Sequence, residues 1–168
     1  AFLFSRGFIK TGLGKRIAYN LIAAFGSSSL RLAYALALSD LILAPATPSN
    51  TARVGGVIMP ITTSLAKAFG SEPQDGPRKI GSFLMQSIYQ VNTITSAMFQ
   101  TSMAGNTLVA ALALQSFGIG ITWGDWAMAA IVPGIVALLI MPYFIYKVYP
   151  PEIRDAREAQ QMIREELR

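Results

Sequence analysis

Two apolar arms of similar length occupy residues 29–70, and residues 45–51 (PATPSNT) join them. A helix that crosses a membrane needs about 20 apolar residues, and each arm is shorter than that. The pattern therefore predicts two half-length helices joined by a polar tip, which is typical of a re-entrant hairpin. The alternative is an ordinary soluble helical hairpin with a proline-rich turn.

The tip has the properties of an anion site. Pro45 and Pro48 lack an amide hydrogen and hold the residues before them out of the helical region, so the first arm should end there. Ser49 or Asn50 would then cap the second arm. A helix start carries free N–H groups and roughly half a positive charge, which favours an anion. At membrane depth such backbone is tolerated only inside protein or beside a watery cavity.

Arg53 follows the tip by one turn of helix. On membrane-insertion scales a buried arginine costs about 2.5 to 3.5 kcal/mol, so we expect it to have a partner, either an acidic side chain or an anionic ligand. Asp40 is the only acidic residue of the hairpin. We expect Asp40 to join a local network or to pair with a basic residue rather than to take part in chemistry.

The apolar stretch 80–117 is far too long for a single span. Polar residues follow its first part, and 102–107 (SMAGNT) has the composition of a break followed by a new helix start. Gly105 permits unusual backbone angles, and Asn106 or Thr107 could cap the new helix. We expect a helix broken near the middle of the membrane. One long tilted helix with its polar side chains against its neighbours is the alternative.

The remaining segments complete an all-α integral membrane pattern. Residues 1–28 place basic side chains beside apolar ones, which indicates an interfacial amphipathic helix and the end of a preceding span. Residues 126–149 predict a continuous span, and 150–168 predict a charged, exposed linker helix on the cytoplasmic side.

Positive charge sets the expected orientation. If the hairpin returns to the side at which it enters, Arg31, Lys67, Arg78 and Lys79 all lie on one side. Loops rich in Lys and Arg are typical of the cytoplasmic side, so we assign this side to the cytoplasm.

Composition also indicates a membrane protein. Of the 168 residues 52% are hydrophobic and 14% are charged, against about 25% charged residues in soluble domains. The positions of the basic residues explain the net charge of +5, so we expect no nucleic-acid partner. The chain begins at Ala1 without Met, and we expect it to be a piece of a longer protein.

The residue types present argue against an enzyme. The sequence has no cysteine and no histidine, which excludes disulfides, zinc or haem ligation and the usual pairs of nucleophile and base. No pair of carboxylates lies within the apolar region, which argues against hydrolysis. We therefore expect no catalytic residue, no metal ligand and no cofactor.

Two interrupted elements beside one full span, with helix starts that converge on a polar point, are the pattern of secondary transporters built from inverted repeats. Five short motifs in order resemble the divalent anion:sodium symporter family: SNT at 49–51, AR-x-GG at 52–56, GSEP at 70–73, MAGN at 103–106 and YPPE at 149–152. The resemblance covers nearly the whole chain. It looks closest to the exchanger branch, the citrate/succinate, tartrate/succinate and 2-oxoglutarate/malate translocators, and the chain would be a fragment of the N-terminal repeat without the earlier spans.

The resemblance implies a homodimeric, elevator-type carrier for di- or tricarboxylates in a bacterial inner membrane or a plastid inner envelope. Residues 29–149 would be half of its transport domain, and without the second repeat of the same protein this fragment would not transport. Two Ser-Asn-Thr tips, one per repeat, would grip the substrate carboxylates. The expected substrate-binding residues are Ser49, Asn50, Thr51, Arg53, Ser102, Gly105 and Asn106.

The expected coupling follows from one departure from the family pattern. Sodium-coupled members use a further hydroxyl residue about one turn before the Ser, and here that position is Pro45. A missing side-chain oxygen weakens a site for a hard cation. We hypothesise that Arg53 replaces sodium electrostatically, which gives a sodium-independent exchanger. The alternatives are a sodium-coupled dicarboxylate or sulfate symporter and a membrane scaffold that does not transport.

Overall fold

The computed structural model describes residues 13–166, which form helices joined by short connections. The helices are α2 (Leu13–Phe25), α3 (Ser29–Leu43), α4 (Asn50–Arg53), α5 (Met59–Ala68), α6 (Gly81–Met98), α7 (Ala104–Phe117), α8 (Trp123–Val148) and α9 (Arg157–Glu166). Short 3-10 turns lie at Ala44–Ala46 and Gln100–Ser102, and a π-helical turn, Val54–Ile58, joins α4 to α5. The all-α class is confirmed for the described residues. Residues 1–12 of the predicted interfacial element lie outside them.

Region 29–70 folds as two helical arms with a break between them. Ser28 caps α3, and the backbone becomes extended at Thr47, between the two prolines. Ser49, with φ −140° and ψ 112°, caps a second helical stretch that continues from Asn50 to Ala68. The predicted serine cap at the tip is therefore confirmed.

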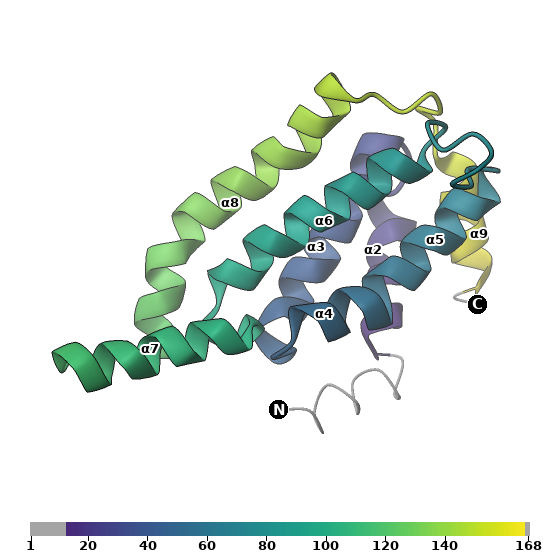
Figure 1. Ribbon diagram of the computed structural model, residues 1–168. Coiled ribbons are helices and arrows are strands. Elements are labelled where there is room, and N and C mark those ends of the chain that lie inside the picture. The colour runs from purple at the N-terminus through teal and green to yellow at the C-terminus, as the bar shows by residue number, and fades with distance from the viewer. Residues whose placement is uncertain (1–12, 167–168) are drawn as a thin grey trace.

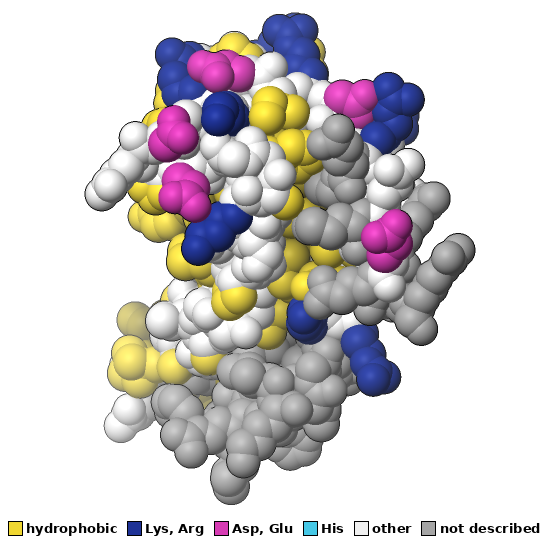
Figure 2. All heavy atoms as spheres, turned by 90° about the vertical axis from the view of Figure 1, so that its right-hand side faces the viewer, with side chains coloured by type: hydrophobic (Ala, Val, Ile, Leu, Met, Phe, Trp, Pro, Cys, Tyr) yellow, Lys and Arg dark blue, Asp and Glu magenta, His cyan; other side chains and the backbone are white. Residues whose placement is uncertain are grey.

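The second arm returns to the end of the molecule at which the first arm begins (Figure 1). The Ser29 amide donates to the Arg154 carbonyl at 3.0 Å, and the Ile153 amide donates to the Lys79 carbonyl at 2.9 Å. The start of α3, the loop after α5 and the segment after α8 are thus held together. Figure 2 shows charged side chains gathered at this upper end of the molecule.

Within residues 13–166, two helical segments are long and apolar enough to cross a membrane: Ser29–Ala46, with 18 residues, and Trp123–Val148, with 26 residues. At about 1.5 Å per residue the first reaches about 27 Å, close to the thickness of a hydrocarbon core. Length alone therefore does not separate a re-entrant arm from a span at 29–46.

Helix α8 packs closely on α6, also contacts α3, and leaves its remaining faces open. Gly134 makes this close approach possible, because a Cβ atom there would lie 2.5 Å from Met98 Cγ. The other faces carry exposed apolar side chains, such as Met128 at 72% and Val132 at 69% exposure. The helix begins at Trp123, three residues before the predicted start at 126, because Thr122 and Asp125 form a capping box.

Helix α9 is docked rather than free. The charged composition of 150–168 predicts an exposed helix, yet Ala156 and Ile163 are buried and Gln160 Nε2 donates to the Ala23 carbonyl at 2.9 Å. The C-terminal segment therefore packs against α2, and Ala156 and Ile163 join the core. This core is shared by α2, α3, α5 and α6.

Candidate functional site

The tip of the hairpin keeps its polar groups near the surface. The side chains of Ser49 and Asn50 are half-buried, and that of Thr51 is exposed. Ser49 Oγ accepts a hydrogen bond from the Ala52 amide at 3.2 Å, and Asn50 Oδ1 accepts one from the Thr51 amide at 2.9 Å. The tip side chains therefore pair the first amides of their own helix, while the Asn50 NH₂ group donates to no described residue.

A second interruption separates α6 from α7. Phe99 and Met103 are both extended, with φ of −126° and −150°, and they flank the turn at 100–102. Ser102 Oγ donates to the Ser96 carbonyl at 2.6 Å, and Asn106 Nδ2 donates to the Ser96 and Phe99 carbonyls at 2.7 and 2.9 Å. Ser102 and Asn106 are buried, so they satisfy carbonyl groups that the end of α6 would otherwise leave unpaired.

This interruption lies nearer the N-terminus than the predicted 102–107. Gly105 and Asn106 fall in the first turn of α7, and Gly105 is not among the described glycines with positive φ. The prediction that Asn106 or Thr107 caps α7 is wrong: the cap position is Met103, which makes no side-chain hydrogen bond. Asn106 is drawn instead to the buried carbonyls of α6, because these groups have no water to bind.

The two interruptions lie side by side. Thr101 Oγ1 donates to the Pro45 carbonyl at 2.9 Å, which ties the turn after α6 to the tip. In Figure 1, α4 and α7 begin close to this point and run away from it in different directions. A helix start carries a partial positive charge. The region between the two starts therefore favours negative charge.

Arg53 fills the space between the two interruptions and is 1% exposed. Its Nε forms an ion pair with Asp40 Oδ1 at 2.8 Å. Its Nη1 donates to the carbonyls of Thr47 and Ser102, both at 3.4 Å. Its Nη2 donates to three polar side chains of α6: Asn92 Oδ1 and Ser96 Oγ at 3.1 Å, and Thr95 Oγ1 at 3.3 Å.

Asp40 is buried to the same degree as Arg53. Its Oδ1 accepts from Arg53 Nε, and its Oδ2 accepts from the Thr95 hydroxyl. The expectation that Asp40 pairs with a basic residue is confirmed, and of the two partners expected for Arg53 the structure shows the acidic side chain. Together the two groups carry no net charge.

The structure brings the predicted site residues to one region but divides them by access. Ser49, Asn50, Thr51 and Gly105 are at least partly exposed. The buried members are Arg53, Ser102 and Asn106. A ligand at the surface can therefore contact the exposed residues directly. The buried residues can affect such a ligand only by positioning the exposed ones.

Sequence reasoning missed the polar side chains of α6 that surround Arg53. Asn92, Thr95 and Ser96 are spaced i, i+3 and i+4, so they lie on one face of the helix. This polar face of an apolar helix is a detectable signal. The sequence offers no means of telling that its partner is an arginine of the hairpin.

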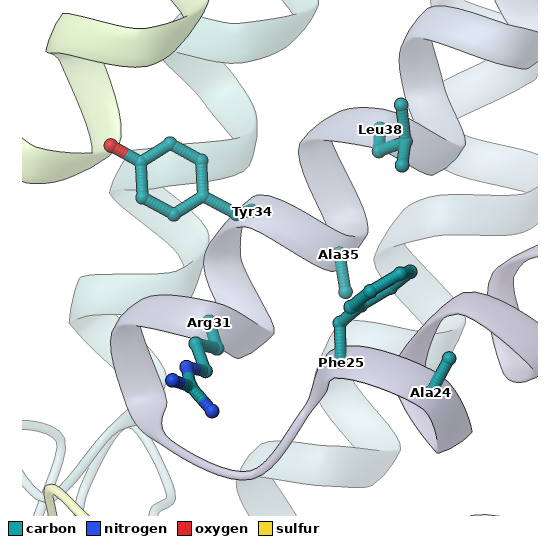
Figure 3. A pocket seen from close by; sticks show the side chains of 6 residues that line it. All are labelled: Ala24, Phe25, Arg31, Tyr34, Ala35 and Leu38. Carbon is teal, nitrogen blue, oxygen red and sulfur yellow. The ribbon is translucent and has the colours of Figure 1, made fainter.

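A cavity of about 520 Å³ lies away from this region, between α2 and α3 (Figure 3). Arg31, Tyr34 and Leu38 of α3 and Phe25 of α2 line part of it. The Tyr34 hydroxyl donates to the Leu139 carbonyl, and Arg31 Nη1 donates to Ser27 Oγ at 3.1 Å. No predicted site residue lines this cavity, so it is separate from the tip.

Known proteins align with nearly the whole chain. Dicarboxylate transporter 1, chloroplastic, of Spinacia oleracea is 51% identical over 168 residues, 99% of this chain and 30% of the relative. Inner membrane protein YbhI of Escherichia coli (strain K12) is 53% identical over 154 residues, 92% of this chain and 32% of the relative. The L-tartrate/succinate antiporter of Escherichia coli (strain UTI89 / UPEC) is 39% identical over 168 residues, 99% of this chain and 34% of the relative.

The chain spans about a third of the length of these curated relatives. The resemblance that the short motifs indicate is confirmed over its full length, since the family described as sodium:sulfate symporter transmembrane region matches residues 1–168. The chain therefore belongs to this family of membrane transporters, the divalent anion:sodium symporters.

Proposed function

We propose that this chain supplies the first half of the substrate site of a di- or tricarboxylate transporter, for acids of the 2-oxoglutarate, malate, succinate and citrate class. The names of two relatives, a dicarboxylate transporter and a tartrate/succinate antiporter, support this class of substrate. Because the chain spans about a third of these relatives, a second repeat of the same protein would complete the site. The active form would be a homodimer in a bacterial inner membrane or a plastid inner envelope, and the fragment would not transport alone.

One observation carries the proposal: the two interruptions of the chain lie beside each other. A carboxylate binds best to hydrogen-bond donors that are already oriented, and helix starts provide them. The hydroxyls of Ser49 and Thr51 and the NH₂ group of Asn50 would bind one carboxylate at the tip. The start of α7 would face it, where Gly105 has no side chain to cover the backbone. Arg53, Ser102 and Asn106 would act from behind this surface.

The hairpin is proposed to be re-entrant, with its tip near the middle of the membrane. The polar groups of the break then have protein and a watery site around them, as irregular backbone at that depth requires. Helix α8 would be the continuous span, and the end that carries Arg31, Arg78 and Lys79 would face the cytoplasm.

We propose sodium-independent exchange as the mode of transport. A hard cation such as sodium needs several oxygen ligands. Pro45 offers no side-chain oxygen, its carbonyl accepts a hydrogen bond from Thr101, and the Thr47 carbonyl accepts one from Arg53. Two backbone carbonyls of the tip are thus already engaged, which weakens a site for a hard cation there.

Counterflow in liposomes that contain the full-length protein tests the mode and the substrate class together. Liposomes loaded with an unlabelled dicarboxylate should take up labelled 2-oxoglutarate or malate equally in sodium and in choline buffer. A strict requirement for external sodium contradicts exchange without sodium. The absence of uptake for every carboxylate contradicts the substrate class and supports a scaffold that does not transport.

A sodium-coupled symporter is the second candidate, and the pairing of Arg53 favours it. With Asp40 at 2.8 Å the pair is neutral, so Arg53 does not by itself provide the charge of a sodium ion. In the counterflow experiment this candidate predicts uptake in sodium buffer and little in choline.

A further inference from the structure

We infer that Asp40 and Arg53 are positioning residues of the proposed substrate site: their buried ion pair fixes the hairpin tip against the break between α6 and α7, and neither side chain contacts the substrate. The inference rests on the proposed function above. It differs from a direct role for Arg53, because the arginine then acts through the groups that it holds.

The ion pair closes the tip from behind. Asp40 lies in the last turn of α3 and Arg53 at the end of α4, so the break of the first arm lies between them. The Arg53 Nη1 bond to the Thr47 carbonyl attaches the irregular segment itself to the same guanidinium. The orientation of Ser49 to Thr51 therefore depends on this pair.

The same guanidinium also holds the second interruption. A guanidinium has five N–H donors in a rigid plane, and the recorded partners of Arg53 engage all three of its nitrogens. One of these partners is the Ser102 carbonyl, and others lie on the polar face of α6. Tip, α6 and break are thus tied to one planar group.

Removal of the Asp40 carboxylate distinguishes a positioning role of Arg53 from a direct role in substrate binding. If Arg53 attracted substrate by its charge, removal of the Asp40 carboxylate would leave that charge uncompensated and strengthen anion binding. If the pair positions the tip, the same change loosens it and weakens binding. The sign of the effect of Asp40→Asn on substrate affinity therefore separates the two roles.

Replacement of Arg53 by Lys gives a second separation. Lysine keeps the positive charge but presents a compact ammonium with three donors, which cannot reproduce the planar fork. A positioning role predicts that Arg53→Lys loses affinity, whereas a charge role predicts affinity near that of the unmodified protein.

The test is substrate affinity in the purified full-length protein, measured with labelled 2-oxoglutarate or malate. We expect Asp40→Asn and Arg53→Lys each to raise Kd by about tenfold, a change of about 1.4 kcal/mol in binding free energy. The double variant Asp40→Asn, Arg53→Gln should lose less affinity than Asp40→Asn and Arg53→Gln lose in sum when each is measured alone, because residues of one network do not act independently. Tighter binding by Asp40→Asn, or unchanged binding by Arg53→Lys, would overturn the inference.

A matched pair of threonines keeps the test valid if the charge variants fold poorly. Thr95 is buried and bonds to both members of the pair, whereas Thr93, two residues earlier on α6, is exposed and donates to the Tyr89 carbonyl. Thr95→Val should weaken substrate binding several-fold, and Thr93→Val should leave it unchanged. Equal affinities for the two variants contradict the inference.

The outcomes also separate this inference from the proposed function. If the unmodified protein binds no di- or tricarboxylate, the proposed function fails. If it binds one, and the Asp40, Arg53 and Thr95 variants bind it equally well, only the positioning role fails.

Discussion

Side chains at the two interruptions of the chain form hydrogen bonds with opposite ends of the peptide group. At the first, Ser49 and Asn50 pair the Ala52 and Thr51 amides in the first turn of the second arm. At the second, Ser102 and Asn106 pair the carbonyls that end α6, and neither the Ala104 nor the Gly105 amide has a partner among the described residues. The donors left for an anion are therefore side chains and the Asn50 amide at the tip, and backbone amides at the start of α7. Side chains at the first break therefore act mainly as acceptors for amides, and side chains at the second break act as donors to carbonyls.

The largest expected effect in this comparison comes from Asn106→Ala. The change removes both bonds from Nδ2 to the carbonyls of Ser96 and Phe99 in a buried setting. The free energy of unfolding should fall by about 1 to 3 kcal/mol. Thermal unfolding of the full-length protein in detergent measures the loss.

Thr107→Ala is the matched control for Asn106, because Thr107 is exposed and its hydroxyl bonds only within α7, to the Ala104 carbonyl. Its unfolding temperature should stay close to that of the unmodified protein. If Asn106→Ala is as stable as this control, the second break is not held by Asn106.

Ser49→Ala should have a smaller effect on stability and a clear effect on binding. Loss of the cap bond to the Ala52 amide costs about 1 kcal/mol of unfolding free energy. Because the same hydroxyl is proposed to meet the substrate, Kd should also rise. Ser64→Ala, at an exposed serine of α5, provides the comparison and should change neither quantity. A Kd unchanged by Ser49→Ala would remove the tip serine from the proposed site.

Gly105→Ala should have the smallest effect on stability, and in the opposite direction. An added Cβ would lie 3.0 Å from Met103 Cε, the end of a flexible side chain, so it can be accommodated. Alanine favours a helix by about 1 kcal/mol over glycine, although less at a helix start, so the unfolding temperature should stay constant or rise slightly. Substrate affinity should fall if a carboxylate approaches the start of α7, and an unchanged Kd places the ligand elsewhere.

Local features made much of the fold predictable. Prolines and a polar cap act within a few residues of themselves, so the break after α3 and the cap at Ser49 could be predicted from sequence. Helix α9 shows the limit of this reasoning. Its charged composition suggests exposure, but Ile163, the preceding Ala156 and the bond from Gln160 to the Ala23 carbonyl hold it against α2.

The site was predictable in its residues and less so in its connections. The need of Arg53 for a partner follows from the cost of burying a charge, and Asp40 is the only acid nearby in sequence. The bonds to α6 connect residues as far apart as Arg53 and Ser96, and such contacts depend on how the helices pack. The second break also differs from its predicted position for this reason. Helix packing brings the Ser96 and Phe99 carbonyls near Asn106, which binds them instead of capping α7.

The π-helical turn at Val54–Ile58 sets the angular phase of the tip. In a regular α-helix, Ile61 would lie about 80° around the axis from Arg53, so the two would lie near opposite edges of one buried face. A π turn absorbs one extra residue, which reduces this offset to about 20°. Arg53 and Ile61 are accordingly both buried. The two exposed glycines, Gly55 and Gly56, lie in this π turn, so they lie in the segment that sets the direction of the Arg53 side chain relative to the second arm.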